Sequence, residues 1–345
     1  MRATYKKYIL QFKQASGTSR GVLRTKETFF LQIENNEKVG IGECAIFRGL
    51  SADDVPSYES KLQWLCNNIH LPKQELLKEL IEYPSIQFGL EQAFLSIQDI
   101  DKFTLFPSNF TNGEKSININ GLVWMGTADF MKQQIKEKLK SGFTTIKLKI
   151  GAIDFETELN LLKSIRKEFT TKEITLRVDA NGAFKSGEAL EKLKQLSDFE
   201  LHSIEQPIKA NQWLEMAELC AKTPLDIALD EELIGVFYKK DKKKILETIK
   251  PQYIILKPSL LGGVYGTNEW IKLANKQHVG WWITSALESN IGLNAIAQYT
   301  YSLGNKIPQG LGTGGLFTNN ITSPLRVEKG NLLYDTNLDW NFNLF

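Results

Sequence analysis

From about residue 116, short runs of β-branched residues alternate with amphipathic stretches at a regular interval. The strand candidates are 117–122, 144–150, 174–179, 201–205, 225–230, 253–257 and 280–285. Their ends at Lys149, Asp179, Glu205, Asp230, Lys257 and Ser285 are 30, 26, 25, 27 and 28 residues apart. Between two of them, residues 154–169 carry apolar side chains at helical spacing (Leu159, Leu162, Ile165 and Phe169). One strand and one helix fill such an interval, and about eight units close a parallel barrel, so the spacing predicts a β/α barrel.

The first 110 residues or so lack this alternation. Three β-like segments at 5–13, 28–34 and 39–43 are followed by helical patterns at 51–67, 73–82 and 85–102. Strands followed by helices predict a separate α+β unit. The last twenty or so residues, rich in Asn and Leu, break the barrel rhythm. We therefore expect an α+β domain at residues 1–112, completed by about 320–345, and a barrel at 113–319.

Composition and charge exclude several classes of protein. The chain has 345 residues, 42% of them hydrophobic, and no apolar run approaches the length of a membrane helix. The start of the sequence lacks the apolar stretch of a signal peptide. A net charge of +2 gives no reason to expect nucleic acid as a partner. Three distant cysteines without a Cys-x-x-Cys pair argue against disulfides and a thiolate zinc site, so we expect a cytoplasmic protein.

Charged residues lie at the end of almost every strand candidate. In a parallel barrel both faces of a strand are buried, so such positions are expected to be apolar. A buried charge must pair or bind a metal, and the carboxyl ends of barrel strands converge on one mouth. A stray surface charge would explain any single residue, but the whole set indicates an active site. Its members are Lys147, Lys149, Arg177, Asp179, Glu205, Asp230 and Lys257.

Three carboxylates in this set predict a metal site. Asp179, Glu205 and Asp230 end three successive strands, so they can meet on one side of the mouth. Hard oxygen ligands without nearby Cys or His favour Mg²⁺ over zinc or copper. The histidines are dispersed, and His202 has the opposite parity to Glu205, which predicts that it points outward in a structural role.

The lysines predict a base. Lys147 and Lys149 are two residues apart on one strand, so both side chains project to the same face. Two like charges this close in a desolvated interior shift one ammonium group towards its neutral amine form, and a neutral lysine can accept a proton. Lys257 comes from a later strand, roughly across the mouth. The alternative, that the lysines only balance the carboxylates, does not require the doublet.

Together these groups suit removal of a proton from the carbon next to a carboxylate. Negative charge then grows on the carboxylate oxygens as an enediolate forms. A divalent cation held by three carboxylates can stabilise that charge as a Lewis acid. One lysine would take the proton, and a cation on the opposite face would add electrostatic stabilisation.

The same residues resemble the enolase superfamily and, within it, the muconate-lactonising-enzyme-like subgroup. The matching motifs are TTIKLKIG around Lys147 and Lys149, RVDANGAF around Asp179 and Asn181, SIEQP around Glu205, ALDEEL around Asp230, and ILKPSLLGG around Lys257. Sites of this superfamily use a Lys or His base with Mg²⁺. The resemblance implies a modified (β/α)₇β TIM-type barrel with an N-terminal α+β capping domain.

Three further segments are similar to the o-succinylbenzoate synthase family of menaquinone biosynthesis. They are ININGLVWMG at 117–126, GIGECAIFRGLS at 40–51 and TSALESNIGLNAIAQ at 284–298. This resemblance implies dehydration of 2-succinyl-6-hydroxy-2,4-cyclohexadiene-1-carboxylate to o-succinylbenzoate. Lys149 would take the α-proton and then protonate the departing hydroxyl. Lys147 would tune Lys149, Lys257 would stabilise the enediolate, and Asp179, Glu205 and Asp230 would hold Mg²⁺, with Mn²⁺ as a possible substitute.

The resemblance also implies residues that bind the substrate. Ser285 would contact the succinyl carboxylate, and Asn181 and Gly312 would line the pocket. Arg177 would contact the substrate or support the metal site through a salt bridge. Many relatives carry Asp where Gly312 stands, in the loop 309–316 that would close part of the pocket. Residues 16–24 resemble a loop that covers the pocket, although a plain hairpin turn is the simpler interpretation.

Two alternatives stay open. An N-acylamino-acid racemase or dipeptide epimerase would use Lys149 and Lys257 as two bases on opposite faces. Dipeptide epimerases usually carry Asp-x-Asp on the late strand, where this chain reads TSALES, which disfavours the epimerase but leaves the racemase open. A barrel that binds without catalysis is the other alternative, but such a descendant would be expected to lack a ligand or lysine, and none is missing. A small-molecule carboxylate is the expected partner, and the sequence leaves monomer or homo-oligomer undecided.

Overall fold

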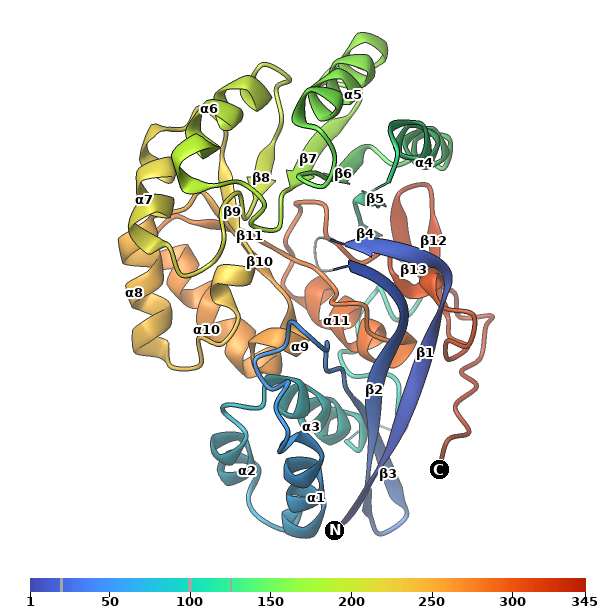
Figure 1. Cartoon of the computed structure of the whole chain (residues 1–345). Helices are drawn as coiled ribbons and strands as arrows, with labels where there is room; N and C mark the ends of the chain where they lie inside the picture. Colours follow the sequence, from blue (N-terminus) through green and yellow to red (C-terminus); the bar gives the residue numbers. More distant parts are fainter. Residues whose placement is uncertain (19–20, 99–100, 125) are drawn as a thin grey trace.

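The structure is a computed structural model that describes residues 1–18, 21–98, 101–124 and 126–345. A long hairpin and three helices at the N-terminus lie against a larger ring of alternating strands and helices (Figure 1). Within these residues, none of the helices has the length and apolar character needed to cross a membrane.

The N-terminal unit is a three-stranded antiparallel sheet with helices against one face. Its elements are β1 (Arg2–Thr18), β2 (Gly21–Asn35), β3 (Lys38–Cys44), α1 (Tyr58–Asn68), α2 (Lys73–Glu79) and α3 (Pro84–Ser96). The predicted strands lie inside the observed ones, but the first helix begins at Tyr58 and not at residue 51. Residues 47–57 form turns, in which the Ser51 hydroxyl accepts the Phe47 amide hydrogen at 2.8 Å. The prediction of a helix from residue 51 was therefore wrong, because this local hydrogen bond competes with helix formation.

Helix α3 packs directly on β3 because two glycines of the strand leave room for the helix backbone. A Cβ atom at Gly42 would lie 1.9 Å from the carbonyl oxygen of Gly89, and one at Gly40 would lie 2.1 Å from that of Ala93. Any side chain at either position would push the helix away. The close contact buries an apolar core that includes Phe29, Leu31 and Leu90.

Seven parallel strands form the second sheet in strict sequence order. They are β5 (Gly121–Val123), β6 (Thr145–Lys149), β7 (Thr175–Asp179), β8 (Ser203–Glu205), β9 (Ile227–Leu229), β10 (Tyr253–Leu256) and β11 (Gly280–Ile283). Helices connect them: α4 (Ala128–Lys140), α5 (Phe155–Glu168), α6 (Ser186–Ser197), α7 (Trp213–Lys222), α8 (Lys239–Ile249), α9 (Pro258–Leu261) and α10 (Gly263–Lys276), while α11 (Asn290–Ser302) follows β11. The predicted βα repeat is confirmed.

Local sequence explains where these helices begin and which face they bury. In α5, the side chain of Asp154 accepts the Thr157 amide hydrogen at 3.0 Å and so caps the helix. Leu161, Leu162 and Ile165 are buried on one face of α5, at the spacing of an amphipathic helix. Burial of each such side chain stabilises the fold by roughly 1.5–3 kcal/mol.

A short segment closes the barrel between β11 and β5. Gln309 donates its amide hydrogen to the Asn118 carbonyl and accepts that of Asn120, both at 2.9 Å. Gly310 donates to the Ile283 carbonyl at 2.8 Å and accepts from Ser285 at 3.0 Å. These bridges are parallel, so residues 309–310 occupy the eighth strand position of a (β/α)₇β barrel.

The predicted strand at 117–122 is two strands in different sheets, which corrects the sequence interpretation. β4 (Ile117–Asn118) pairs with β13 (Asn331–Tyr334), which pairs with β12 (Leu325–Glu328), whereas β5 belongs to the barrel. The C-terminal residues then return towards the N-terminal unit. Trp340 stacks on Phe103 with ring centroids 4.4 Å apart, and Phe342 lies 5.4 Å from Phe30. The division into domains at 1–112 with 320–345 and 113–319 stays a prediction.

Candidate active site

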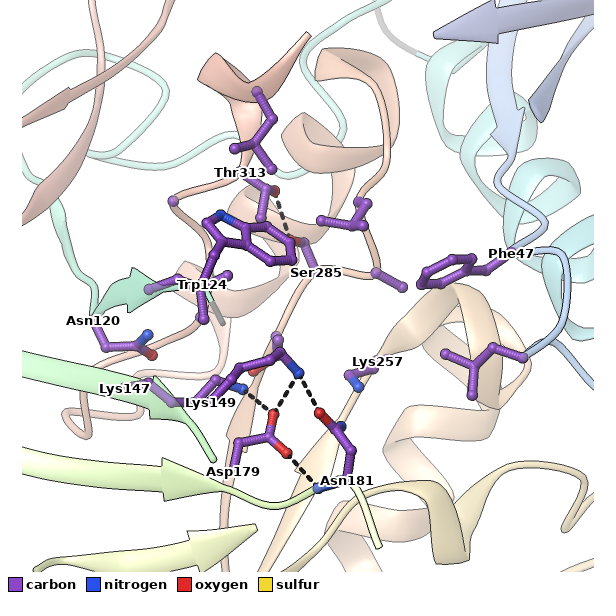
Figure 2. Close-up of a pocket in the computed structure, with 18 of the residues that line it drawn as sticks. Phe47, Asn120, Trp124, Lys147, Lys149, Asp179, Asn181, Lys257, Ser285 and Thr313 are labelled. Atoms are coloured by element: carbon purple, nitrogen blue, oxygen red, sulfur yellow. Dashed lines mark hydrogen bonds and ion pairs between the residues drawn. The ribbon is translucent and has the colours of Figure 1, made fainter. Parts of the chain in front are cut away.

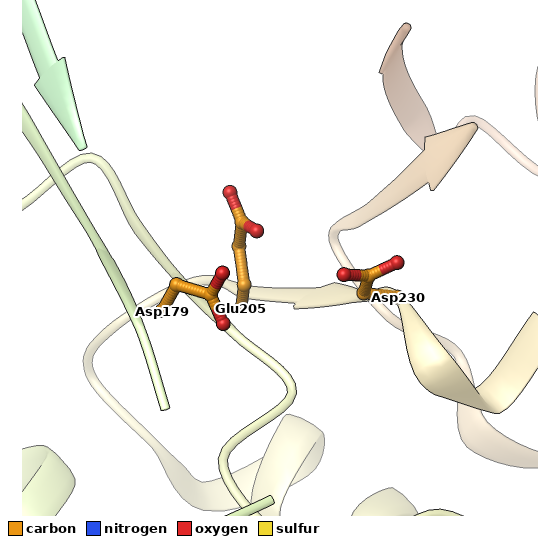
Figure 3. Close-up of side chains that lie close together, drawn as sticks. All are labelled: Asp179, Glu205 and Asp230. Atoms are coloured by element: carbon orange, nitrogen blue, oxygen red, sulfur yellow. The ribbon is translucent and has the colours of Figure 1, made fainter. Parts of the chain in front are cut away.

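Three buried carboxylates meet where neighbouring barrel strands end (Figure 3). Asp179 ends β7, Glu205 ends β8 and Asp230 follows β9, and one oxygen from each lies within 4.8 Å of the others. Glu205 Oε1 is buried and has no hydrogen-bond partner among the described residues. An unpaired buried anion is costly, and three hard oxygen donors suit a divalent cation. The residues present therefore fit a divalent metal ion.

Two lysines of β6 contact these carboxylates from one side. Lys147 Nζ lies 2.7 Å from Glu205 Oε2 and 3.1 Å from Asp179 Oδ2. Lys149 Nζ lies 2.9 Å from Asp179 Oδ2 and 2.7 Å from Asn181 Oδ1. Because the two lysines alternate with Leu148, they share the inner face of the strand, as their spacing predicts.

Lys257 lies on the opposite side of the same cavity. It follows β10, which is four places from β6 in the strand order, and four places in an eight-position barrel is half a turn. Its Nζ is 2.5 Å from Asp230 Oδ2. Figure 2 shows Lys149 and Lys257 on either side of the space above Asp179 and Asn181. A small molecule between them would have one lysine on each face.

Electrostatics in this group differ from one expectation from the sequence. Burial by itself lowers the pKa of Lys147, but the carboxylates of Glu205 and Asp179 outweigh it, and the pKa is raised. The carboxylates around the doublet therefore favour the charged form of Lys147, which is opposite to the effect expected of two neighbouring lysines alone. Burial raises the pKa of Glu205, and the neighbouring charges of Asp179 and Asp230 raise it further. The surroundings of Glu205 hold too little positive charge to offset its burial and the charges of the two neighbouring carboxylates, and a bound cation would supply it.

The cavity above these groups has about 890 Å³ of space free of protein atoms, including open solvent at its mouth. Apolar walls come from Phe47 and Leu50 of the turn segment after β3 and from Trp124 after β5. Opposite the carboxylates, the Ser285 and Thr313 hydroxyls are hydrogen-bonded at 2.6 Å. A cavity with apolar walls and a few polar groups is typical of small-molecule sites.

Three of the four predicted substrate-binding residues line this cavity: Asn181, Ser285 and Gly312. The Asn181 amide accepts from Lys149 and donates to Glu231 Oε1 at 2.9 Å. A Cβ at Gly312 would meet nothing closer than Ile119 Cδ1 at 3.5 Å, so this position has room for a side chain. The predicted loop 309–316 also contributes Gly310, Thr313 and Leu316 to the wall.

Arg177 lies elsewhere. Its side chain is fully buried, donates to the Pro308 carbonyl at 2.9 Å, and stacks 4.1 Å from the Trp282 ring centroid. It is not part of the cavity wall, and among the described residues it forms no salt bridge. Arg177 is two residues before Asp179, one layer deeper in the barrel, which explains why its predicted place at the mouth was wrong. Burial lowers its pKa to about 10.

His202 also differs from expectation. It was predicted to point outward, but its ring centroid lies 5.1 Å from that of Tyr253 and 6.0 Å from that of Trp282. β8 begins only at Ser203, so strand alternation does not extend to residue 202. Burial and the charge of Arg177 lower the pKa of His202 to about 4.

Sequence reasoning assigned no role to several residues of the cavity wall. These are Phe47, Leu50, Asn120, Trp124 and Leu287. The similar segments at 40–51 and 117–126 contain four of them, so a signal existed without a residue-level role. The predicted covering loop at 16–24 includes residues 19–20, which lie outside the described residues.

Comparisons of the sequence and of the structure with known proteins point to the same family. The family model described as Enolase C-terminal domain-like matches residues 130–337. An o-succinylbenzoate synthase from Desulfotalea psychrophila is 44% identical, over 96% of this chain and 98% of the relative. An L-Ala-D/L-Glu epimerase from Bacillus subtilis is 26% identical over 84% and 81% of the two chains. The crystal structure of MenC from Desulfotalea psychrophila superimposes with a TM-score of 0.87 and 42% identity, over 96% of this chain and 99% of the other.

Proposed function

The chain belongs to the enolase C-terminal domain-like family, and from this membership we propose that it acts as an o-succinylbenzoate synthase. The reaction is dehydration of 2-succinyl-6-hydroxy-2,4-cyclohexadiene-1-carboxylate to o-succinylbenzoate, a carbon–oxygen lyase reaction. The observation that carries the proposal is the full-length similarity to the synthase of Desulfotalea psychrophila. The lysines on opposite sides of a carboxylate cluster supply the groups that this chemistry needs.

Asp179, Glu205 and Asp230 would hold the metal ion, which we propose is Mg²⁺, with Mn²⁺ as a possible substitute. When bound, the ion supplies Lewis-acid stabilisation of charge on the substrate carboxylate. The unpartnered oxygen of Glu205 supports this assignment. Lys147 bridges Glu205 and Asp179, so it holds two of the carboxylates in place and sets the electrostatic surroundings of Lys149.

Lys149 would act as the base. A neutral Lys149 accepts the proton from the carbon next to the substrate carboxylate, and its ammonium form then gives a proton to the departing hydroxyl, which leaves as water. Asn181 orients the Lys149 amine through its side-chain oxygen. Lys257, on the other face, stabilises the negative charge that grows on the enediolate. Ser285, Gly312 and the neighbouring wall would receive the succinyl group.

A racemase or epimerase activity is the second candidate, because two lysines on opposite faces could also serve as two bases. In that reaction one lysine removes a proton and the other returns one, so no water leaves. The late-strand segment 284–289 carries no Asp-x-Asp to bind a substrate ammonium. The lower identity to the Bacillus subtilis epimerase also favours the synthase.

We place the activity in menaquinone biosynthesis, with a small-molecule carboxylate as the partner. The three cysteines, Cys44, Cys66 and Cys220, are free thiols. Free thiols support a cytoplasmic location, since the cytoplasm keeps thiols reduced.

A spectroscopic assay with the cyclohexadiene substrate tests the proposal. The wild-type protein should form the aromatic product with Mg²⁺, and chelation of the metal should stop turnover. Racemisation of an N-succinyl amino acid is measured in parallel. Good racemisation without dehydration would make the second candidate the correct one.

A further inference from the structure

The loop after β11 carries four residues of the cavity wall and is held by a buried carboxylate outside that wall. Thr284, Ser285, Ala286 and Leu287 line the cavity, and the fully buried Glu288 follows them. One carboxylate oxygen of Glu288 accepts the Ala286 amide hydrogen at 2.7 Å. Leu287, between them, has φ of 64°, a left-handed conformation that is strained for leucine. The hydrogen bond therefore holds the loop in a shape that its backbone alone disfavours.

The second oxygen of the same carboxylate reaches the neighbouring strand end. The Ser259 hydroxyl donates to Glu288 Oε1 at 2.5 Å, and Ser259 is buried two residues after Lys257. β10 and β11 are paired neighbours in the barrel. Glu288 therefore links the strand end that carries Lys257 to the strand end that carries Ser285.

The N-terminal sheet supplies a charge and a second anchor to this cluster. Lys26 of β2 is 4% exposed, and its ammonium has no hydrogen-bond partner among the described residues. The acidic groups whose charges act on it are Glu43 and Glu288. Glu43 of β3 accepts amide hydrogens from Ser289 at 2.9 Å and from Gly292 at 2.8 Å, at the start of α11. Lys26 thus offsets the cost of two buried carboxylates that join the sheet to the barrel.

We propose that Glu288 is a positioning residue that fixes Lys257 and Ser285 relative to one another, with Glu43 anchoring the adjoining start of α11 to the N-terminal sheet. Both oxygens of Glu288 bind protein groups, so it acts on the reaction only through Ala286 and Ser259. Its kinetic consequence rests on the proposed function. Misplacement of a positioning group by about 1 Å can lower a rate by roughly 100-fold, so the link matters for catalysis.

The variant Glu288→Gln tests this role, because glutamine keeps the size but has one acceptor oxygen in place of two. Glu91→Gln is the matched control. Glu91 of α3 is also buried and also joins the N-terminal unit to the barrel, accepting the Val264 amide hydrogen at 2.6 Å. Val264 and the neighbouring residues at the start of α10 do not line the cavity. We expect kcat/KM to fall by about 10–100-fold in Glu288→Gln but by less than about threefold in Glu91→Gln, with unchanged Mg²⁺ affinity in both.

Hydrogen–deuterium exchange without substrate gives a readout that does not depend on the reaction. Peptides covering 257–261 and 284–289 should both exchange about tenfold faster in Glu288→Gln and stay unchanged in Glu91→Gln. Unchanged exchange in the two peptides would overturn the proposal, and so would an equal loss of kcat/KM in both variants. Absence of dehydration by the wild-type protein contradicts the proposed function instead, and the exchange result then decides the positioning role alone.

Discussion

The candidate active site has two halves that the chain builds in different ways. The barrel half consists of residues at the ends of β6 to β10: Lys147, Lys149, Asp179, Glu205, Asp230 and Lys257. The loop half consists of residues outside these strand ends: Phe47, Leu50, Trp124, Ser285 and Thr313. Strand register fixes the first half, since Lys149, Asp179 and Glu205 are direct partners across β6, β7 and β8. Long-range contacts fix the second.

This difference separates the reaction class from the choice of substrate. The barrel half contains the groups that we propose remove a proton next to a carboxylate and stabilise the resulting negative charge, whether or not water then leaves. We propose that the loop half, which lines the rest of the cavity, determines which molecule fits between the lysines. A segment far from the barrel in sequence, residues 47–50, reaches it through turns held by Arg48, whose Nη1 lies 2.7 Å from Asp54 Oδ1. Changes in the two halves should therefore affect different kinetic constants.

The largest effect is expected for Lys149→Ala in the barrel half. Removal of the proposed base should lower kcat by roughly 10²–10⁴-fold, because general acid–base catalysis typically contributes that much. The measurement is product formation at saturating substrate, with circular dichroism and Mg²⁺ titration as controls for folding and metal binding. A variant that keeps a tenth or more of the wild-type kcat would show that another group takes the proton.

The barrel half was also the part that the sequence predicted best, and for a physical reason. Period-two alternation and the βα repeat place Lys147, Lys149 and Asp179 on one face without knowledge of tertiary contacts. The same reasoning gave wrong positions for two side chains that lie deeper in the barrel than the strand ends. Arg177 has the correct parity, but depth in the barrel depends on where the strand begins, and His202 precedes its strand altogether.

Of the loop half, Ser285 was predicted by residue and Thr313 only as part of the loop 309–316, whereas Phe47, Leu50 and Trp124 were covered only by similar segments, because turns carry little periodic information. No local pattern relates Thr313 to Ser285, whose hydroxyls meet across 28 positions of the chain. The break between β4 and β5 was missed for a similar reason. Ile117 pairs with Leu332 near the C-terminus, a partner that the run of β-branched residues does not reveal.

The second largest effect is expected for Glu205→Gln. Loss of one carboxylate should weaken Mg²⁺ binding by at least about 100-fold, since even outer partners of metal ligands contribute about 10–100-fold. Calorimetric titration measures the affinity. Glu232→Gln is the control, because Glu232 is a buried neighbour that binds the Gln206 side chain and the Asn211 amide instead. Equal metal affinity in wild type and Glu205→Gln would remove this residue from the proposed ligands.

A smaller effect is expected in the loop half for Leu50→Ala. Leu50 supplies apolar wall to the cavity, and loss of such contact should raise KM about tenfold while kcat changes little, because binding is weakened equally in ground and transition states. Val55→Ala is the matched control, since Val55 lies in the same segment, is 36% exposed and does not line the cavity. A fall in kcat without a rise in KM would show that the two halves are not separable in this way.

The smallest effect on turnover is expected for Asp53→Asn, which alters the anchor of the loop half. The Asp53 carboxylate accepts the Ser85 amide hydrogen at 2.9 Å and its hydroxyl hydrogen at 2.7 Å, and burial raises the pKa of Asp53 to about 6. Because this folded-state pKa lies above the ordinary value of 3.8, the protonated form favours folding. The stability that Asp53 contributes is full below the ordinary pKa and is lost as pH rises through about 6.

Urea unfolding between about pH 4 and about pH 7 measures this contribution, and the Asp53→Asn variant, whose amide side chain does not titrate, provides the reference. The unfolding free energy of the wild type, relative to Asp53→Asn, should fall by up to about 3 kcal/mol across this range, since about two pKa units separate the folded and unfolded states. Parallel pH curves for the two proteins would contradict the raised pKa. We expect kcat to be nearly unchanged in Asp53→Asn, because Asp53 does not line the cavity and the groups of the barrel half stay in place. The pH dependence of the unfolding free energy would then reflect the segment that carries Phe47 and Leu50.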